Sequence, residues 1–216
     1  MIKNIIFDFG GVICTIDHPE AIRRFSKLGL KDAEVQLNPY TQGGIFGAIE
    51  EGKIDEEEFR IKLSEQCGRE LTLDECLWGW LGYRKEVPTR NIELLRSLRR
   101  RGYRLIMLSN TNPYMMAWAM SPDFSKYLDV EEPKGLPASS YFDSVYLSYE
   151  LGVMKPDVKF FEHVIKSENI IPEESLFIDD GPRNVSSAST LGLKTLQPDN
   201  GSDWTKALED ILSSNN

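Results

Sequence analysis

Short, continuous apolar runs alternate with amphipathic segments along most of this chain. Five runs are predicted to be strands, over residues 4–10, 103–110, 143–148, 175–180 and 193–197. Most are apolar without a polar alternation, which is typical of strands buried on both faces. Helical patterns are predicted over residues 89–102, 157–169, 182–192 and 204–214. Strands that alternate with helices predict an α/β fold, a Rossmann-like parallel sheet covered by helices.

The stretch from residue 15 to residue 88 interrupts this alternation and is predicted to be wholly helical. Two of its segments begin with a capping-box pattern, Asp55 with Glu58 and Thr72 with Glu75. The stretch lies between the first predicted strand and the helix that precedes the second. We therefore expect a helical cap domain over 15–88, inserted after the first strand into a core domain formed by 1–14 and 89–216.

The net charge of −9 over 216 residues argues against nucleic acid and anionic membranes as primary partners. It leaves room for a small phosphorylated substrate in a local cationic or metal-bearing pocket. The three cysteines match no zinc pattern, which favours a reducing compartment. No apolar run approaches the roughly 18 residues needed to span a bilayer. We expect a cytoplasmic protein with no membrane partner, either a monomer or a homodimer.

Polar residues that could carry chemistry stand where the predicted strands end or turn: Asp8, Ser109, Asn110, Lys155, Asp179 and Asp180. Ligands of an open parallel sheet bind outside the carboxyl ends of its strands, so these groups are expected to converge. Three carboxylates in one cleft repel each other unless positive charge lies among them. Lys155 and a divalent ion would balance them, and hard oxygen ligands with room for a phosphate favour Mg²⁺.

The motifs around these residues are FDFGGV at 7–12, LSNTN at 108–112, GVMKPD at 152–157 and FIDDGPRN at 177–184. In this order they resemble the haloacid dehalogenase-like (HAD) superfamily. Any one motif is a weak signal, but four in order, each at a predicted strand end or the turn after it, are specific. The resemblance implies a Mg²⁺-dependent phosphatase that hydrolyses a small phosphomonoester through an aspartyl-phosphate.

The resemblance also implies a role for each motif residue. Asp8 matches the nucleophile, and Lys155 matches the lysine that neutralises charge on Asp8 and on the transferring group. Ser109 and Asn110 match the residues that bind the phosphate. The metal would be held by Asp8, the backbone carbonyl of Gly10, Asp179 and Asp180. Asn184 stands where relatives use a residue that orients the acids.

Gly10 departs from the pattern, because most family phosphatases carry a second Asp two residues after the nucleophile. That Asp is the acid/base, and losing such a group costs about 10²–10⁴-fold in rate. Either the chain is an impaired or non-catalytic phosphate-binding protein, or another group replaces the acid, or the leaving group needs little help. The last explanation fits the phosphatase branch that includes bacterial α-D-glucose-1-phosphate phosphatase, which also has Gly at this position. We therefore expect a sugar phosphate as the substrate.

A haloacid dehalogenase is the remaining alternative within the family. Dehalogenases resemble this chain in fold and nucleophile, but they need no metal and lack the paired acids of the fourth motif. Asp179 and Asp180 would then be two uncompensated carboxylates beside Asp8. The paired acids therefore favour the phosphatase over the dehalogenase.

Overall fold

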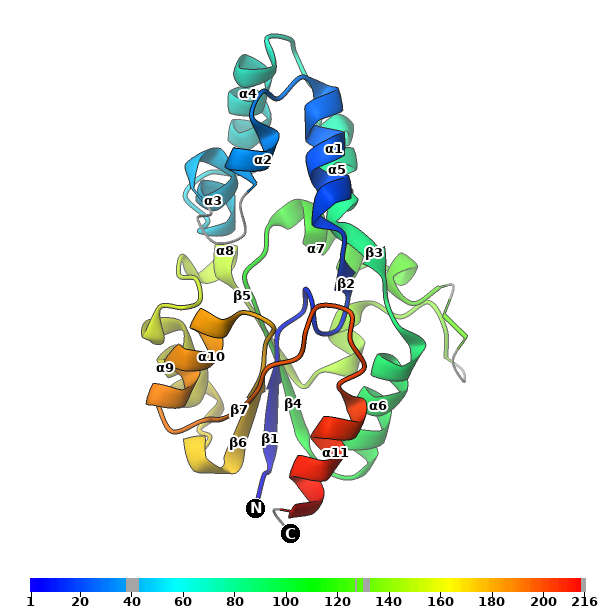
Figure 1. Ribbon diagram of the computed structural model, residues 1–216, viewed down its shortest axis with the longest axis vertical. Helices are drawn as coiled ribbons and strands as arrows, with labels where there is room; N and C mark the ends of the chain where they lie inside the picture. The colour runs from blue at the N-terminus through cyan, green and yellow to red at the C-terminus, as the bar shows by residue number, and fades with distance from the viewer. Residues whose placement is uncertain (38–42, 127, 130–132, 215–216) are drawn as a thin grey trace.

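A five-stranded parallel sheet forms the centre of the computed structural model, which describes residues 1–37, 43–126, 128–129 and 133–214 (Figure 1). Its strand order is β5-β4-β1-β6-β7. The strands are β1 (Asn4–Phe7), β4 (Arg104–Ser109), β5 (Ser144–Leu147), β6 (Ser175–Ile178) and β7 (Lys194–Leu196). All neighbouring pairs in this sheet are parallel. The predicted α/β fold is confirmed, and each predicted strand is present at nearly its expected position.

The central strand β1 aligns with both of its neighbours in the sheet, so that the residues after β1 and β6 lie at the same edge. All four of its residues are buried. Phe7, its last residue, pairs with Met107 of β4 on one side and with Ile178 of β6 on the other. The residues that follow these positions therefore meet at one edge of the sheet, which is the edge expected to bind ligands.

Helices cover both faces of the sheet (Figure 1). On one face lie α6 (Thr89–Arg100) and α11 (Thr205–Ser214), whose Leu95 and Leu208 join the core cluster that contains Phe7. On the other face lie α9 (Val158–Glu168) and α10 (Pro182–Thr190), whose Phe160 and Ala188 pack against the opposite side of the strands. Burial on both faces explains why the strands are apolar throughout.

A separate helical body lies over the carboxyl-end edge of the sheet (Figure 1). It contains α1 (His18–Leu28), α2 (Ala33–Gln36), α3 (Gly44–Glu50), α4 (Glu56–Cys67) and α5 (Leu73–Trp80). Its own hydrophobic core is rich in aromatic rings, including Phe25, Phe46, Phe59 and Trp80. Both predicted capping boxes are present, at the starts of α4 and α5. We call this body the cap.

The prediction that residues 15–88 are wholly helical is wrong at both ends. Strand β2 (Thr15–Ile16) pairs antiparallel with β3 (Arg84–Glu86). The chain leaves the core and returns to it side by side here, and pairing satisfies backbone groups of both connections. Strands of two and three residues are too short to show a hydrophobic period, so the sequence pattern could not reveal them. The domain limits at 14/15 and 88/89 stay a prediction.

Helix α7 (Pro113–Ala119), which follows β4, joins the core to the cap. Its Tyr114 belongs to the cap's hydrophobic cluster and donates a hydrogen bond to the carbonyl oxygen of Glu56, 2.8 Å away. Asn112 precedes this helix and caps it, accepting a hydrogen bond from the N–H of Met115. The cap is therefore held by contacts beyond its two connecting segments.

The remaining elements are short: α8 (Ser148–Leu151) and the 3₁₀ turns Leu81–Tyr83, Pro122–Phe124, Ala138–Tyr141 and Pro172–Glu174. Helix α8 directly follows β5 and so begins at the same edge of the sheet as the other strand ends. Within the described ranges, no helix combines the length and the apolar composition that crossing a membrane requires.

Candidate active site

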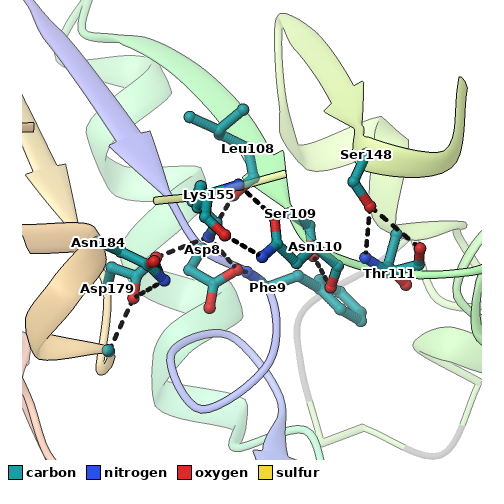
Figure 2. Close-up of polar contacts among 11 residues, drawn as sticks. Asp8, Phe9, Leu108, Ser109, Asn110, Thr111, Ser148, Lys155, Asp179 and Asn184 are labelled. Atoms are coloured by element: carbon teal, nitrogen blue, oxygen red, sulfur yellow. Dashed lines mark hydrogen bonds and ion pairs between the residues drawn. The ribbon is translucent and has the colours of Figure 1, made fainter. Parts of the chain in front are cut away.

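Asp8 stands directly after β1, with its backbone N–H bonded to the carbonyl oxygen of Ile178 at 2.8 Å. Its side chain is 12% exposed. The Oδ1 atom accepts hydrogen bonds from the N–H of Phe9 at 2.7 Å and from Nζ of Lys155 at 2.8 Å (Figure 2). These contacts fix the carboxylate through one oxygen and leave Oδ2 as the atom that could react.

Lys155 is buried, at 3% exposure, and its ammonium group has three acceptors. Nζ lies 2.8 Å from Oδ1 of Asp8, 2.6 Å from Oδ2 of Asp179 and 2.9 Å from the carbonyl oxygen of Leu108 (Figure 2). An ammonium has three N–H groups, so all of them are satisfied. Burial lowers the pKa of Lys155, but the two carboxylates outweigh burial and raise it overall, so the residue is a permanent cation.

Asp179 is completely buried directly after β6. Besides the ion pair with Lys155, its Oδ1 accepts hydrogen bonds from the N–H of Gly181 at 2.7 Å and from Nδ2 of Asn184 at 3.0 Å. Asn184 is thus in contact with the acid that the resemblance implies it orients. The next residue, Asp180, is half-buried.

Gly11 explains why the first and fourth motifs fit together. A β-carbon at Gly11 would lie 2.2 Å from Oδ2 of Asp180, a distance at which atoms overlap. Its φ is +82°, in the left-handed region that favours glycine. Only glycine therefore allows this turn to approach the Asp180 carboxylate so closely.

Carboxylate oxygens of Asp8, Asp179 and Asp180 all lie within 4.8 Å of one another. Burial raises the pKa of Asp8 to about 8, with Lys155 opposing the rise, and burial together with Asp179 raises the pKa of Asp180 to about 6. Clustered hard oxygen donors with excess negative charge are the ligand set that Mg²⁺ prefers. In the described part of the chain no N–H donates to the carbonyl oxygen of Gly10, which leaves it available as a further ligand. The residues present fit the magnesium ion, and their ligand roles stay predictions.

Ser109 and Asn110 lie at the end of β4, at the same edge as Asp8. The Ser109 side chain is buried, and among the described residues its Oγ has only a long 3.3 Å contact, to the carbonyl oxygen of Asn110. Asn110 binds the backbone of Lys155 from both sides: Nδ2 donates to the carbonyl oxygen and Oδ1 accepts from the N–H, each at 2.8 Å. Asn110 therefore positions the lysine, a contact that sequence reasoning missed, and its predicted phosphate contact stays a prediction.

The end of the half-buried Ile16 side chain lies beside Gly10. A β-carbon there would lie 2.6 Å from Cδ1 of Ile16. Asn200 fixes the backbone of Ile16, because its Oδ1 accepts a hydrogen bond from the N–H and its Nδ2 donates one to the carbonyl oxygen, both at 2.9 Å. An apolar side chain thus lies where the usual acid/base Asp would begin. Neither Ile16 nor Asn200 belongs to a motif, so no sequence signal pointed to them.

Known proteins resemble this chain over nearly its whole length. A family model described as haloacid dehalogenase-like hydrolase matches residues 2–192. The D-ribitol-5-phosphate phosphatase of Bacteroides thetaiotaomicron is 48% identical over 214 residues, which cover 99% of this chain and 100% of that protein.

Two solved structures are similar as well. A predicted HAD-like family hydrolase from Porphyromonas gingivalis has 43% identity and a TM-score of 0.90, covering 98% of both chains. A HAD family enzyme from Bacteroides thetaiotaomicron, in complex with magnesium and inorganic phosphate, has 32% identity and a TM-score of 0.84. The match covers 96% of this chain and 99% of that one.

Proposed function

Because the chain belongs to the haloacid dehalogenase-like hydrolase family, we propose that it is a Mg²⁺-dependent phosphatase acting on a polyol or sugar phosphate. The observation that carries the proposal is the buried ion-pair set of Asp8, Lys155 and Asp179 at the end of β1. The phosphatase relative named for D-ribitol-5-phosphate, which aligns from end to end, supports the substrate class. The relative that holds magnesium and phosphate supports the metal.

In this proposal Oδ2 of Asp8 attacks the phosphorus atom. The bond between phosphorus and the ester oxygen breaks, and the alcohol leaves with a proton taken from water. A water molecule then attacks the phosphorus of the aspartyl-phosphate and gives up a proton, which neutralises the hydroxide left by the first step. Inorganic phosphate is released and the Asp8 carboxylate is restored. Phosphoryl transfer needs positioning and charge neutralisation more than other help. Lys155, held by Asn110 and Asp179, supplies a fixed positive charge beside the attacking carboxylate.

Asp8, Asp179, Asp180 and the carbonyl oxygen of Gly10 would hold the magnesium ion, which supplies positive charge for the phosphoryl oxygens and favours the ionised form of Asp8. Ser109 would donate a hydrogen bond to the phosphate from the end of β4. Ser109 Oγ has no short hydrogen bond among the described residues, which leaves it free to do so.

Because Gly10 stands where most relatives have an acid, no side chain at position 10 can protonate the leaving oxygen. Ribitol has no anomeric carbon, and its 5-phosphate leaves as an ordinary primary alkoxide. A substrate of this kind does not have the easy leaving group of a sugar 1-phosphate. The full-length relative therefore favours an alditol phosphate over an anomeric one, and the leaving oxygen takes its proton from a source other than residue 10.

Release of inorganic phosphate by the purified full chain tests this proposal. D-Ribitol 5-phosphate, glucose 1-phosphate, nucleotides and acyl phosphates are compared with and without Mg²⁺. We expect D-ribitol 5-phosphate to be among the best substrates, and Asp8→Asn to lower kcat at least about 10³-fold. Asp74→Asn, the same change at an exposed residue of the cap, is the matched control and should keep wild-type activity.

The outcomes separate the two function classes. Turnover that needs both Asp8 and Mg²⁺ supports the phosphatase. If the wild type and Asp8→Asn are equally inert on every substrate, the phosphatase proposal fails, and a phosphate-binding protein without catalysis is the alternative that the absence of an acid at Gly10 allows.

A further inference from the structure

The turn that follows β1 is held by two buried side chains of the core that belong to no motif. Asn91 lies in the first turn of α6 and is 1% exposed, and Trp204 directly precedes α11 and is 2% exposed. These two helices lie side by side on one face of the sheet (Figure 1). Nδ2 of Asn91 donates to the carbonyl oxygens of Val12 at 2.9 Å and of Ile13 at 3.2 Å. Nε1 of Trp204 donates to the same Val12 carbonyl oxygen at 3.0 Å.

The Asn91 side chain bonds to this turn through its nitrogen alone. Its Oδ1 is fully buried and has no hydrogen-bond partner among the described residues. The two carbonyl acceptors identify which atom of the amide is the nitrogen, so the oxygen is the atom left unpaired. A buried acceptor without a partner destabilises the folded state. The contacts of Asn91 therefore serve the carbonyls of the turn, and its own oxygen gains no partner from the surrounding packing.

The direction of the Gly10 carbonyl depends on the carbonyls that Asn91 holds. Cys14, the residue after Ile13, accepts the N–H of Gly11 on its own carbonyl oxygen at 2.7 Å. The peptide between Gly10 and Gly11 is planar and trans, so its carbonyl oxygen points away from that N–H. The bond between Gly11 and Cys14 therefore sets the direction of the Gly10 carbonyl, and the place of Cys14 follows from that of Ile13.

The turn is also closed by its own hydrogen bonds, so its residues are coupled to one another. The N–H groups of Ile13 and Cys14 both donate to the carbonyl oxygen of Phe9, each at 2.9 Å. On the side of the candidate metal site, Gly11 lies against the Asp180 carboxylate, which a β-carbon would meet at 2.2 Å. A shift at the buried base of the turn therefore moves a carbonyl ligand relative to the carboxylates with which it would share the ion.

We propose that Asn91, assisted by Trp204, is a positioning residue for the magnesium ion, because it holds the turn that presents the Gly10 carbonyl oxygen. Both side chains act through backbone carbonyls of the turn. Mg²⁺ demands a near-ideal octahedral arrangement of its ligands, so a displaced carbonyl weakens its binding. Removing a group that orients a metal ligand typically lowers metal affinity about 10- to 100-fold. This inference rests on the proposed function and adds residues that shape its metal site.

Two variants of the full chain test the inference. Asn91→Leu removes the donor to both carbonyls, and Trp204→Phe removes the other donor to Val12 but keeps a ring beside Phe7. Isothermal titration calorimetry measures the Kd of Mg²⁺ alone at one fixed pH, without substrate or turnover. We expect Asn91→Leu to raise the Kd about 10-fold or more. Trp204→Phe should raise it less, because Asn91 still holds both carbonyls.

Asn4→Leu is the matched control. Asn4 is buried at the opposite end of β1 from Asp8, where its Nδ2 donates to Oγ of Ser175 at 3.1 Å. The same substitution there removes a buried donor far from the turn, so it should lower stability and leave the Kd of Mg²⁺ unchanged. Thermal melting followed by circular dichroism shows that each variant is folded and compares their losses of stability.

An unchanged Kd in Asn91→Leu would overturn the inference, and so would an equal rise in Asn4→Leu, because general destabilisation would then explain both. If Asn91→Leu does not fold, Trp204→Phe decides: a raised Kd supports the inference and an unchanged Kd rejects it. A wild type that binds no Mg²⁺ refutes the proposed metal site, and the inference with it. A wild type that binds Mg²⁺ no better than Asn91→Leu refutes the inference alone and leaves the phosphatase proposal intact.

Discussion

Replacing Lys155 by Met should destabilise the protein strongly and in a pH-dependent way. The change removes the ammonium group that bridges Asp8 and Asp179, 2.8 and 2.6 Å away, and keeps a long apolar side chain. Removing one partner of a buried ion pair costs about 3–5 kcal/mol, because the other charge is left buried without compensation. Here two carboxylates lose their partner, so we expect the upper part of that range.

The size of the chain converts this cost into a melting temperature. For a domain of this size, 1 kcal/mol changes Tm by about 2–4 °C, so Tm should fall by about 10–20 °C for Lys155→Met. Lys159→Met is the matched control, because Lys159 is exposed on the first turn of α9. Differential scanning calorimetry without Mg²⁺ measures both variants beside the wild type. The control should melt within about 2 °C of the wild type.

The pH dependence gives a second test of the same reasoning. The folded pKa of Asp8 is already above its usual value because of burial, and Lys155 opposes that rise. Without the lysine the folded pKa rises further, so the folded state binds a proton that the unfolded state releases. Stability is then lost as pH rises from the unfolded pKa toward the folded one. The Tm deficit of Lys155→Met should therefore be larger at pH 9 than at pH 5. A deficit below 2 °C at pH 9, or one independent of pH, would refute the reasoning.

Three further predictions concern the cap junction, the first motif and the metal. Glu50→Gln should be more stable than the wild type at pH 8, by up to about 3 kcal/mol in urea denaturation, and this gain should vanish near pH 4. The folded pKa of Glu50, about 7, exceeds its usual value of 4.5, so the ionised carboxyl destabilises the folded state as the pH rises from 4.5 to 7. Gly10→Asp should cost only about 0.5–1.5 kcal/mol of stability, because its β-carbon meets the movable end of the half-buried Ile16 side chain, and adding Ile16→Ala should remove that cost. A larger loss in the single variant would contradict this. Mg²⁺ should raise the Tm of the wild type, and EDTA should reverse this rise, whereas the Tm of Asp180→Asn should rise much less. An equal rise in Tm for the wild type and for Asp180→Asn would exclude Asp180 as a metal ligand.

The sequence determined the architecture of the core and the place of its chemistry. The continuous apolar runs predicted five strands, and a parallel sheet puts their carboxyl ends at one edge whatever the details of packing. Asp8, Asp179 and Ser109 could therefore be placed together before any contact was known. The capping boxes of α4 and α5 could be predicted from the sequence because each involves two residues only three positions apart.

The tertiary structure decided what each residue of the site touches. Lys155 lies on a loop, and only packing brings its ammonium between two carboxylates from different strands. Asn110 holds the backbone of that lysine, a contact that no motif revealed, and its phosphate contact stays a prediction. The ribbon of β2 and β3 was missed because strands this short carry no period.

Gly10 in the first motif and Glu50 in the cap also separate what the sequence determines from what the tertiary structure decides. The sequence alone shows that Gly10 stands where most relatives carry an acid. Only the fold shows that the end of the Ile16 side chain lies beside Gly10. Glu50 stands in no motif, and it meets Asn112 because the cap folds back over the strand ends. Local patterns report interactions within a few residues along the chain. The pairing of groups tens of residues apart depends on how the cap and the core pack, which no local pattern records.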